Sequence, residues 1–207
     1  MTTLRPTYPL LTDRLLLRPF HDADLDALCV IDGDPAVTRY LYWGPRSRAE
    51  VRASLARRKK MTAIEKEGDA IRLAAILRDD GTLVGDISLH YRSREYRQGE
   101  VGFVLHPDHQ GRGYATEATT VLLRLGFEEL GLHRIVGRCD ARNTASAGLM
   151  ERLGMRREAH LRENEFIKGE WCDELVYAML AAEWRAGARA RTATGTGAGA
   201  RTGQDAS

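Results

Sequence analysis

The stretch Gln110-Gly111-Arg112-Gly113-Tyr114-Ala115 lies between a strand-like run that ends at Leu105 and a predicted helix that starts near Tyr114. The two glycines allow a tight turn and a close approach of the backbone to a ligand. The start of the following helix offers free N–H groups and the positive end of its dipole. The pattern therefore predicts a loop that binds an anion such as a phosphate or a diphosphate.

Two common phosphate-binding patterns do not fit this loop. A P-loop needs Gly-Lys-Ser or Gly-Lys-Thr, but Tyr114, Ala115 and Thr116 follow Gly113. A dinucleotide fingerprint needs a third glycine or an alanine at the position of Thr116, and an early parallel βαβ unit. A glycine-rich turn without a ligand is the remaining alternative.

The segments before the loop indicate an antiparallel sheet. Residues 14–19 read as a short strand, and 71–77 and 82–91 are two more, joined by the hairpin turn Asp79-Asp80-Gly81. Residues 22–32 are expected to be helical, as is the segment from Ser47 to Glu65, whose basic run at 57–60 indicates a solvated helix face.

The segments after the loop alternate between helix and strand. A helix from Tyr114 to about Leu130, a strand over 134–139 and a helix from Asn143 to Leu153 are followed by strands near 155–162 and 175–180. The fold class is therefore α/β, with a mixed sheet and helices on its faces.

Length, composition and charge limit the number of domains and the classes of partner. The 207 residues, 43% hydrophobic and 29% charged, suit one domain, and the net charge of +2 argues against a nucleic-acid or membrane partner. Three scattered cysteines predict neither a disulfide framework nor a metal site, and no signal peptide is evident, so a cytoplasmic location is expected. We predict an N-terminal extension (1–10), a domain (11–186) and a flexible tail rich in Ala, Gly, Arg and Thr (187–207).

The spacing Q-x-x-G-x-A of the loop resembles the GNAT superfamily of acyl-coenzyme A-dependent N-acyltransferases. Further stretches are similar to its RimJ/RimL-like branch of ribosomal-protein N-acetyltransferases. These stretches are Leu11-Thr12-Asp13-Arg14-Leu15-Leu16-Leu17-Arg18, residues 102–117, Asn143-Thr144-Ala145-Ser146, Leu153-Gly154-Met155 and Gly169-Glu170-Trp171-Cys172-Asp173. The resemblance covers about residues 11–184.

This resemblance implies a GNAT-like fold, with a mostly antiparallel sheet of six to seven strands and helices on both faces. It also implies acetyl-CoA as the co-substrate and no metal. The strand end should pair with the pantetheine arm, which Asn143 should also contact, although Asn143 could equally be a helix N-cap. The implied coenzyme-binding residues are Phe103, Val104, Leu105, Gln110, Gly111, Arg112, Gly113, Tyr114, Ala115, Thr116, Asn143 and Ser146.

The resemblance also assigns catalytic roles. Glu100 and Glu158 correspond to glutamates that relatives use as the base, and either could instead be a surface carboxylate. Ser146 matches the proton donor proposed for the branch; its alternative is a local hydrogen bond at the helix start. Tyr42 and Trp43 are expected on the acceptor side, although an aromatic loop can serve packing alone.

The implied activity is acetyl transfer from acetyl-CoA to a primary amine, with the N-terminal α-amine of a protein, ribosomal in type, as the favoured acceptor. A small amine such as an antibiotic or a polyamine is the enzymatic alternative, and a non-catalytic acyl-CoA sensor is the other. The partners are thus acetyl-CoA and the amine; a homodimer is left open.

Overall fold

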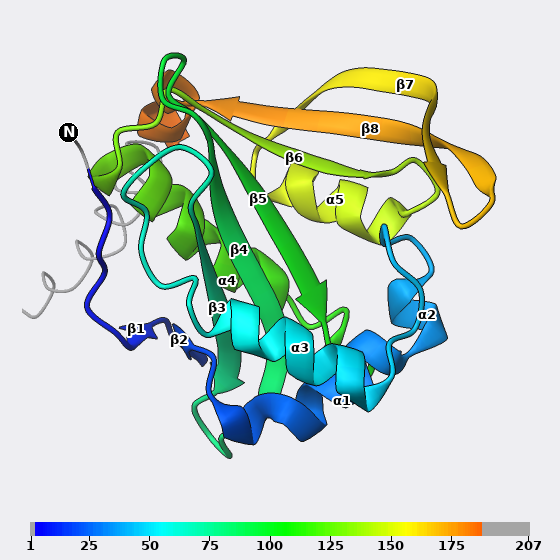
Figure 1. Cartoon of the computed structure of the whole chain (residues 1–207). Coiled ribbons are helices and arrows are strands. Elements are labelled where there is room, and N and C mark those ends of the chain that lie inside the picture. Colours follow the sequence, from blue (N-terminus) through cyan, green and yellow to red (C-terminus); the bar gives the residue numbers. More distant parts are fainter. Residues whose placement is uncertain (1–2, 188–207) are drawn as a thin grey trace, which may run out of the picture.

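The hairpin predicted at Asp79-Asp80-Gly81 joins the two strands in the middle of the sheet, β3 (Ala70–Leu77) and β4 (Leu83–Ser93). Gly81 has a φ of 76°, which favours glycine, and the side chain of Asp80 accepts a hydrogen bond from the Thr82 amide. The computed structural model describes residues 3–187. Figure 1 shows the hairpin strands running the length of the molecule.

The sheet has eight strands in the order β1-β2-β3-β4-β5-β6-β8-β7, and all neighbours are antiparallel except β5 and β6. The predicted α/β class with a mostly antiparallel sheet is confirmed. The six remaining strands are β1 (Leu10–Leu11), β2 (Leu15–Pro19), β5 (Gln98–Leu105), β6 (Arg134–Asp140), β7 (Arg156–Ile167) and β8 (Glu170–Leu180). The strand beyond the predicted six to seven is β1, a two-residue strand too short to show a period.

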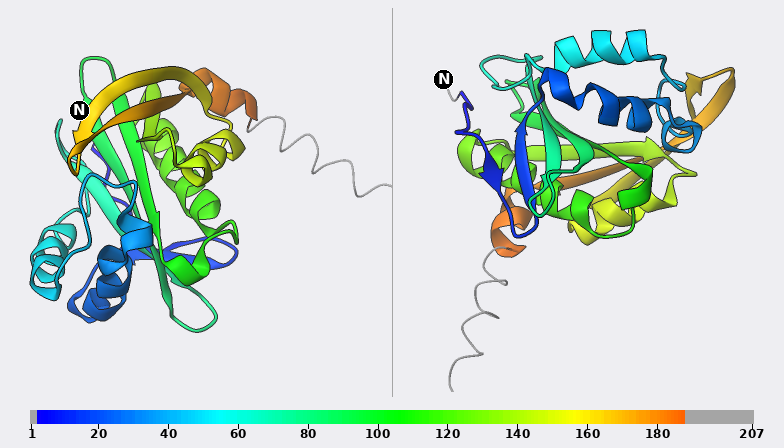
Figure 2. Two further views of the ribbon diagram at one scale, coloured as in Figure 1. Left: turned by 90° about the vertical axis from the view of Figure 1, so that its right-hand side faces the viewer. Right: turned by 90° about the horizontal axis from the view of Figure 1, so that it is seen from below.

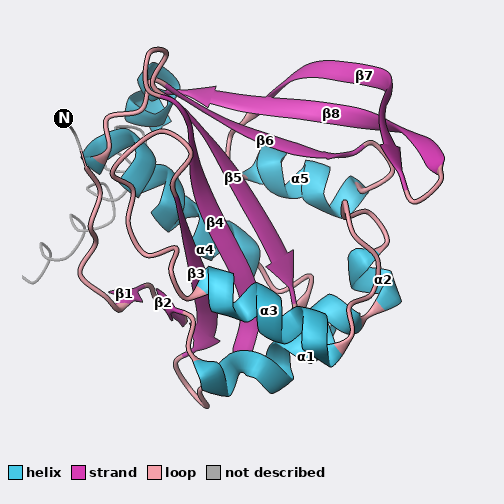
Figure 3. Cartoon of the chain, viewed as in Figure 1, coloured by secondary structure: helices cyan, strands magenta, loops and turns pink. Residues whose placement is uncertain are grey.

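Helices cover both faces of the sheet, as predicted (Figures 2 and 3). They are α1 (Leu25–Gly33), α2 (Pro35–Thr38), α3 (Arg48–Arg58), α4 (Tyr114–Arg124), which continues as a π-helical segment (Leu125–Glu129), and α5 (Thr144–Arg152). Residues 181–187 are also helical. Side chains of α4 and α5 bury against one face, and those of α1 and α3 against the other, in two separate apolar clusters.

The parallel strands β5 and β6 pair over only three positions, from Gln98 with Arg134 to Glu100 with Val136. Beyond Glu100, β5 continues to pair with β4 on one side while β6 continues with β8 on the other. The two strands therefore separate toward Leu105 and Asp140, as Figure 1 shows. One edge of β5 is left without a strand partner, so its backbone can bind an extended ligand.

The helix predicted over 47–65 is shorter than expected. It begins with a capping box between Ser47 and Glu50 and ends at Arg58. After Arg58 the chain leaves the helix, and Ile64 is fully buried and forms an antiparallel bridge with Leu4 of the N-terminal segment. A helix through Glu65 would lose this contact.

The prediction that the basic run at 57–60 forms a solvated helix face is wrong for Arg58. The Arg58 side chain is fully buried, where its Nη2 donates to Asp32 at 2.8 Å and its Nε lies 3.0 Å from Asp86. Arg72 donates to the same Asp86 carboxylate. This network joins α1, α3 and two strands, and Arg46 also pairs with Asp32 at 3.3 Å, so three arginines surround the two aspartates.

The ends of the chain bear on the predicted domain boundaries. Leu4 is buried, and the Tyr8 hydroxyl donates to the Thr62 carbonyl, so residues 3–11 pack on the domain. Almost all of the predicted tail, residues 188–207, lies outside the described residues. The boundaries at 10 and 186 stay predictions. Within residues 3–187, every helix is too short or too polar to cross a membrane.

Candidate active site

The predicted anion-binding loop joins the end of β5 to the start of α4. A single 3-10 turn (Pro107–His109) follows β5, and the Gln110 side chain donates to the Leu105 carbonyl at 3.4 Å. Gly111 and Gly113 have φ values of 73° and 81°. A Cβ at Gly111 would meet nothing within 4 Å, so glycine is needed there for its backbone conformation and not for space.

Gly113 is the N-cap of α4, so the loop runs directly into the helix. The amides of the first turn have no partner within the helix, and the positive end of the dipole is at the same place. The loop and the helix therefore offer several donors to one anion without any basic side chain.

A cavity of about 770 Å³ opens in front of this loop. Its volume is in the usual range for a small-molecule site. It is lined by α2 and the residues after it (Ala36, Val37, Tyr40, Leu41), the end of β5 (Phe103, Val104, Leu105), the loop and the start of α4 (His109, Gln110, Gly111, Gly113, Tyr114, Ala115, Thr116) and α5 (Asn143, Ala145, Ser146, Leu149, Arg152). The structure thus brings together every predicted coenzyme residue except Arg112.

The start of α5 supplies two polar side chains to the cavity. Asn143 is the N-cap, and its Oδ1 accepts a hydrogen bond from the Ser146 amide at 3.0 Å. Among the described residues, neither the Asn143 amide nitrogen nor the Ser146 hydroxyl has a hydrogen-bond partner. Both groups are therefore available to a ligand, while the Ser146 amide makes the local hydrogen bond at the helix start.

Glu100 lies on β5 where the two strands begin to separate. Its Oε2 accepts from Arg92 Nε at 3.1 Å and lies 3.9 Å from Arg138 Nε. Arg138 also donates to Glu174 on β8 at 2.9 Å. Glu100 does not line the cavity itself but belongs to a polar cluster behind it, on the sheet face opposite Phe103 and Leu105.

Tyr42 joins this polar cluster from the loop after α2. Its hydroxyl donates to Glu174, and its desolvation together with the charge of Glu174 raises the pKa of Tyr42 to about 12. Trp43 stacks under the Arg46 guanidinium, 4.4 Å from the ring centre. Neither aromatic residue lines the cavity; Tyr40 and Leu41 do so instead.

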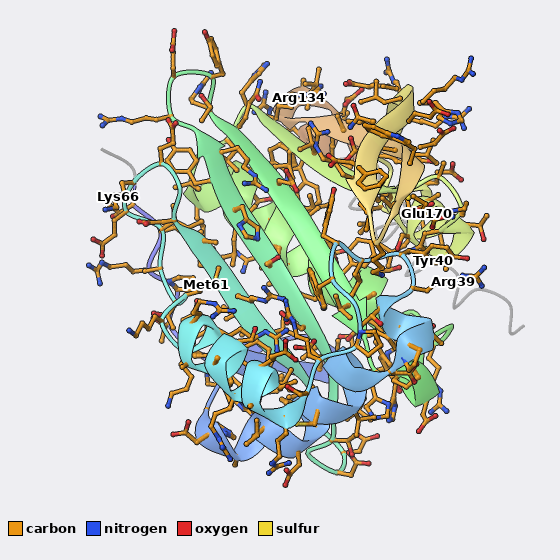
Figure 4. All side chains as sticks on the ribbon, turned by 45° about the vertical axis from the view of Figure 1, so that its right-hand side comes forward. Arg39, Tyr40, Met61, Lys66, Arg134 and Glu170 are labelled. Carbon is orange, nitrogen blue, oxygen red and sulfur yellow. The ribbon has the colours of Figure 1, made fainter. Side chains whose placement is uncertain are left out.

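Glu158, the other predicted base, lies elsewhere. Both of its oxygens accept from Arg134, and this pairing holds the pKa of Glu158 below its usual value. Arg134 pairs with Gln98 where β5 and β6 join, whereas the cavity is at the Leu105 end. Figure 4 shows Arg134 at the top of the sheet, away from Tyr40 of the cavity wall.

Two groups of site residues were missed by the sequence analysis. The part of the cavity wall formed by α2 and the residues after it has no polar motif in the sequence. Its position next to the glycine loop depends on the fold. Glu174 is 3% exposed and binds Tyr42, Arg138 and Asn164. A carboxylate directly before the apolar run at 175–180 was a signal that could have identified it.

The sequence pattern of the acetyltransferase (GNAT) domain matches residues 14–156, which is more than half of the chain. This chain is a GNAT acetyltransferase. The predicted family and enzyme class are thereby confirmed, and acetyl-CoA is the co-substrate typical of the family. The glycine loop and the cavity fit that ligand.

Several relatives of this acetyltransferase cover most of its length. It is 35% identical to the uncharacterized N-acetyltransferase YnaD of Bacillus subtilis (strain 168), over 84% of this chain and 97% of the relative. A crystal structure of a GNAT-family acetyltransferase from Bacillus anthracis superposes with a TM-score of 0.75 at 33% identity, covering 84% of this chain and 99% of that one.

Two relatives have named acceptors. The ribosomal protein uS5-alanine N-acetyltransferase of Escherichia coli (strain K12) is 26% identical, over 88% of this chain and 95% of the relative. The spermidine N(1)-acetyltransferase of the same strain is 24% identical, over 75% and 80%. The resemblance to the RimJ/RimL-like branch agrees with these relatives, whose acceptors are a protein and a polyamine.

Proposed function

We propose that this acetyltransferase transfers the acetyl group of acetyl-CoA to the N-terminal α-amine of a protein. The observation that carries the proposal is a cavity that joins the anion-binding loop to the end of β5, beyond the last position at which β5 pairs with β6, and to the start of α5. A diphosphate at the loop and an extended arm along β5 would bring an acyl group to the strand ends.

The coenzyme is held mainly by backbone groups in this proposal. The amides of Gln110, Gly111, Gly113, Tyr114 and Ala115 bind the diphosphate, with Arg112 and Thr116 beside it. The unpaired edge of β5 at Phe103, Val104 and Leu105 pairs with the pantetheine amides, and Asn143 contacts the same arm. No step requires a metal.

Glu100 is the proposed base and Ser146 the proposed acid. The attacking amine loses a proton to Glu100 as its nitrogen bonds to the acyl carbon, and the carbon–sulfur bond breaks as Ser146 donates a proton to the leaving sulfur. Ser146 then regains a proton from solvent and Glu100 releases its proton to solvent, which restores both groups. An α-amine, with a pKa near 7.7–8.0, is partly neutral already, so an accessible carboxylate is a sufficient base.

Direct transfer is favoured over a covalent enzyme intermediate. Burial raises the pKa of Cys139, on β6 shortly before Asn143, to about 11. Its thiol stays protonated at neutral pH and is a poor nucleophile. A cytoplasmic location is part of the proposal and agrees with three free cysteines.

The acceptor side is formed by Tyr42, Trp43 and the polar cluster around Glu174. The uS5-alanine relative, which aligns over most of the chain, supports a protein N-terminus as the acceptor. A small amine such as a polyamine is the second candidate, and the spermidine relative supports it. A homodimer stays a prediction.

Acceptor panels test the proposal. The enzyme is assayed with acetyl-CoA and peptides that carry free or blocked N-termini, and with spermidine and other small amines. Acetylation of free N-terminal peptides alone supports the proposal, and acetylation of small amines alone supports the second candidate. Coenzyme binding without any acetyl transfer would support the sensor alternative.

Substitutions test the proposed catalytic roles of Glu100 and Ser146. Glu100→Gln and Ser146→Ala should each lower kcat at least tenfold, because acid–base groups typically contribute about 10²–10⁴-fold. Glu158→Gln separates the two predicted bases, and Glu129→Gln, which removes an exposed carboxylate paired with Arg124, is the control. Loss of activity in Glu158→Gln with retention in Glu100→Gln would reverse the assignment.

A further inference from the structure

Arg14 connects the N-terminal part of the chain to the coenzyme loop. It lies in the turn between β1 and β2, and its Nη1 donates to the Arg112 carbonyl oxygen at 3.0 Å. Its guanidinium also lies over the ring of Tyr114, 4.6 Å from the centre. One side chain thus contacts the loop residue before Gly113 and the helix residue after it.

The contact with the Arg112 carbonyl determines the direction of a neighbouring amide. In a trans peptide the C=O and the following N–H point in opposite directions. The bond from Arg14 to the Arg112 oxygen therefore also fixes the direction of the Gly113 N–H. Gly113 lines the cavity, whereas Arg14 and Arg112 do not, so the carbonyl is held on the side away from the ligand.

Without Arg14, this peptide would have an alternative. Gly113 has no side chain and a φ of 81°, so rotation of the peptide before it meets little steric resistance. A rotated peptide would present a carbonyl oxygen to an anion, which is repulsive. The loop therefore needs a group outside the cavity that selects the productive orientation.

Glu117 holds Arg14 in place. One of its oxygens accepts from Arg14 Nε at 2.7 Å, and the other accepts from the Arg14 amide at 2.9 Å and from the Thr12 hydroxyl at 2.6 Å. Glu117 is in the first turn of α4, where a carboxylate is favoured by the helix dipole. A planar guanidinium can bind this carboxylate and the Arg112 carbonyl at once, which a lysine ammonium cannot do with the same geometry.

We propose that Arg14 is a positioning residue for the coenzyme: it fixes the Arg112–Gly113 peptide so that the loop amides face the diphosphate before the ligand binds. This inference rests on the proposed function. It explains why the Thr12-Asp13-Arg14 stretch and the first turn of α4, more than 100 residues apart in the sequence, form one contact set.

Calorimetric titration with acetyl-CoA tests the inference. We expect Arg14→Ala and Arg14→Lys each to raise the Kd at least tenfold. In steady-state assays the KM for acetyl-CoA should rise similarly, with kcat within twofold of wild type. Arg124→Ala, which removes a half-buried arginine paired with Glu129 on the same helix, is the matched control and should leave Kd unchanged.

Hydrogen exchange gives a second readout on the free protein. The Gly113 amide should exchange faster in both Arg14 variants than in Arg124→Ala. If an Arg14 variant does not fold by circular dichroism, Glu117→Gln replaces it, because this change weakens the hydrogen bonds that hold Arg14 without substituting Arg14 itself. It should raise the Kd at least threefold.

The outcomes separate the two proposals. No heat with wild-type protein would contradict the proposed function itself. Wild-type binding together with a Kd for Arg14→Ala within twofold of wild type would overturn the positioning role alone. Wild-type affinity in Arg14→Lys would also overturn it, because charge and not the forked geometry would then be sufficient.

Discussion

The Tyr42 hydroxyl lies 3.3 Å from Glu174 Oε1 and joins the loop after α2 to the start of β8. Arg138 donates to the other oxygen of Glu174 and approaches Glu100, so a continuous series of contacts extends from the loop after α2 to the proposed base. The Glu100 end of this series is on the sheet face opposite Phe103 and Leu105, which line the cavity at the glycine loop. An acceptor and a coenzyme can therefore approach the strand ends from different directions.

Removing the Tyr42 hydroxyl tests the acceptor side. Tyr42→Phe should raise the KM for the acceptor at least threefold and leave the KM for acetyl-CoA unchanged, because only the contact with Glu174 is lost. Initial rates at varied concentrations of each substrate measure both constants. Tyr96→Phe, an exposed tyrosine on another loop, is the control. A change in the KM for acetyl-CoA alone would contradict this assignment.

The buried network around Arg58 is predicted to be essential for stability. Arg58→Ala removes the fully buried partner of Asp32 and Asp86, although Arg46 still contacts Asp32 and Arg72 still contacts Asp86. We therefore expect a loss of about 3 kcal/mol, the lower end of the cost of breaking a buried ion pair. Urea unfolding measures the loss. Arg57→Ala changes an exposed neighbour and should alter the free energy of unfolding by less than about 0.5 kcal/mol. Equal effects of the two changes would refute a core role for Arg58.

The pH dependence of stability should reflect Glu117. Partial burial opposes its ionisation, but hydrogen bonds from Thr12 and Arg14 outweigh it, so the pKa of Glu117 lies below its usual value. Because the folded pKa is below the unfolded value of about 4.3, the stabilisation is present above that pH and is lost as the pH falls through the folded pKa. The stability advantage of wild type over Glu117→Gln should therefore shrink from pH 7 to pH 3.

Urea unfolding of both proteins at several pH values measures this difference. Glu129→Gln serves as a comparison, since Glu129 is exposed and its pair with Arg124 is on the surface. Glu129→Gln should change the free energy of unfolding only slightly at every pH. If the difference in the free energy of unfolding between wild type and Glu117→Gln did not change with pH, ionisation of Glu117 would not contribute to stability.

The local signals in the sequence were sufficient for the site's central part. The glycines at 111 and 113 predicted a tight turn before a helix, and the Asp80-Gly81 turn predicted the β3–β4 hairpin; both depend on backbone conformation that few residues can adopt. Asn143 likewise caps its helix as its residue type suggests.

Features that depend on distant contacts could not be predicted in the same way. In the β7–β8 hairpin, β7 ends at Ile167 and β8 begins at Glu170, so both strands are longer than predicted. The sequence did not indicate this length because β7 is an exposed edge strand with few apolar residues to show a period. The burial of Arg58 depends on aspartates from α1 and β4. The pairing of Glu158 with Arg134 similarly joins residues that no local pattern relates.

Calorimetry on the loop glycine tests the central claim, that the amides of residues 110–115 bind the diphosphate of the coenzyme, most directly. Gly111→Val forces a β-branched residue into a left-handed conformation, which costs at least about 1–2 kcal/mol, whereas a Cβ at this position would itself meet nothing within 4 Å. We predict that wild type binds acetyl-CoA and that Gly111→Val binds it at least tenfold more weakly. Equal affinity of the two proteins, or no binding by wild type, would contradict the account.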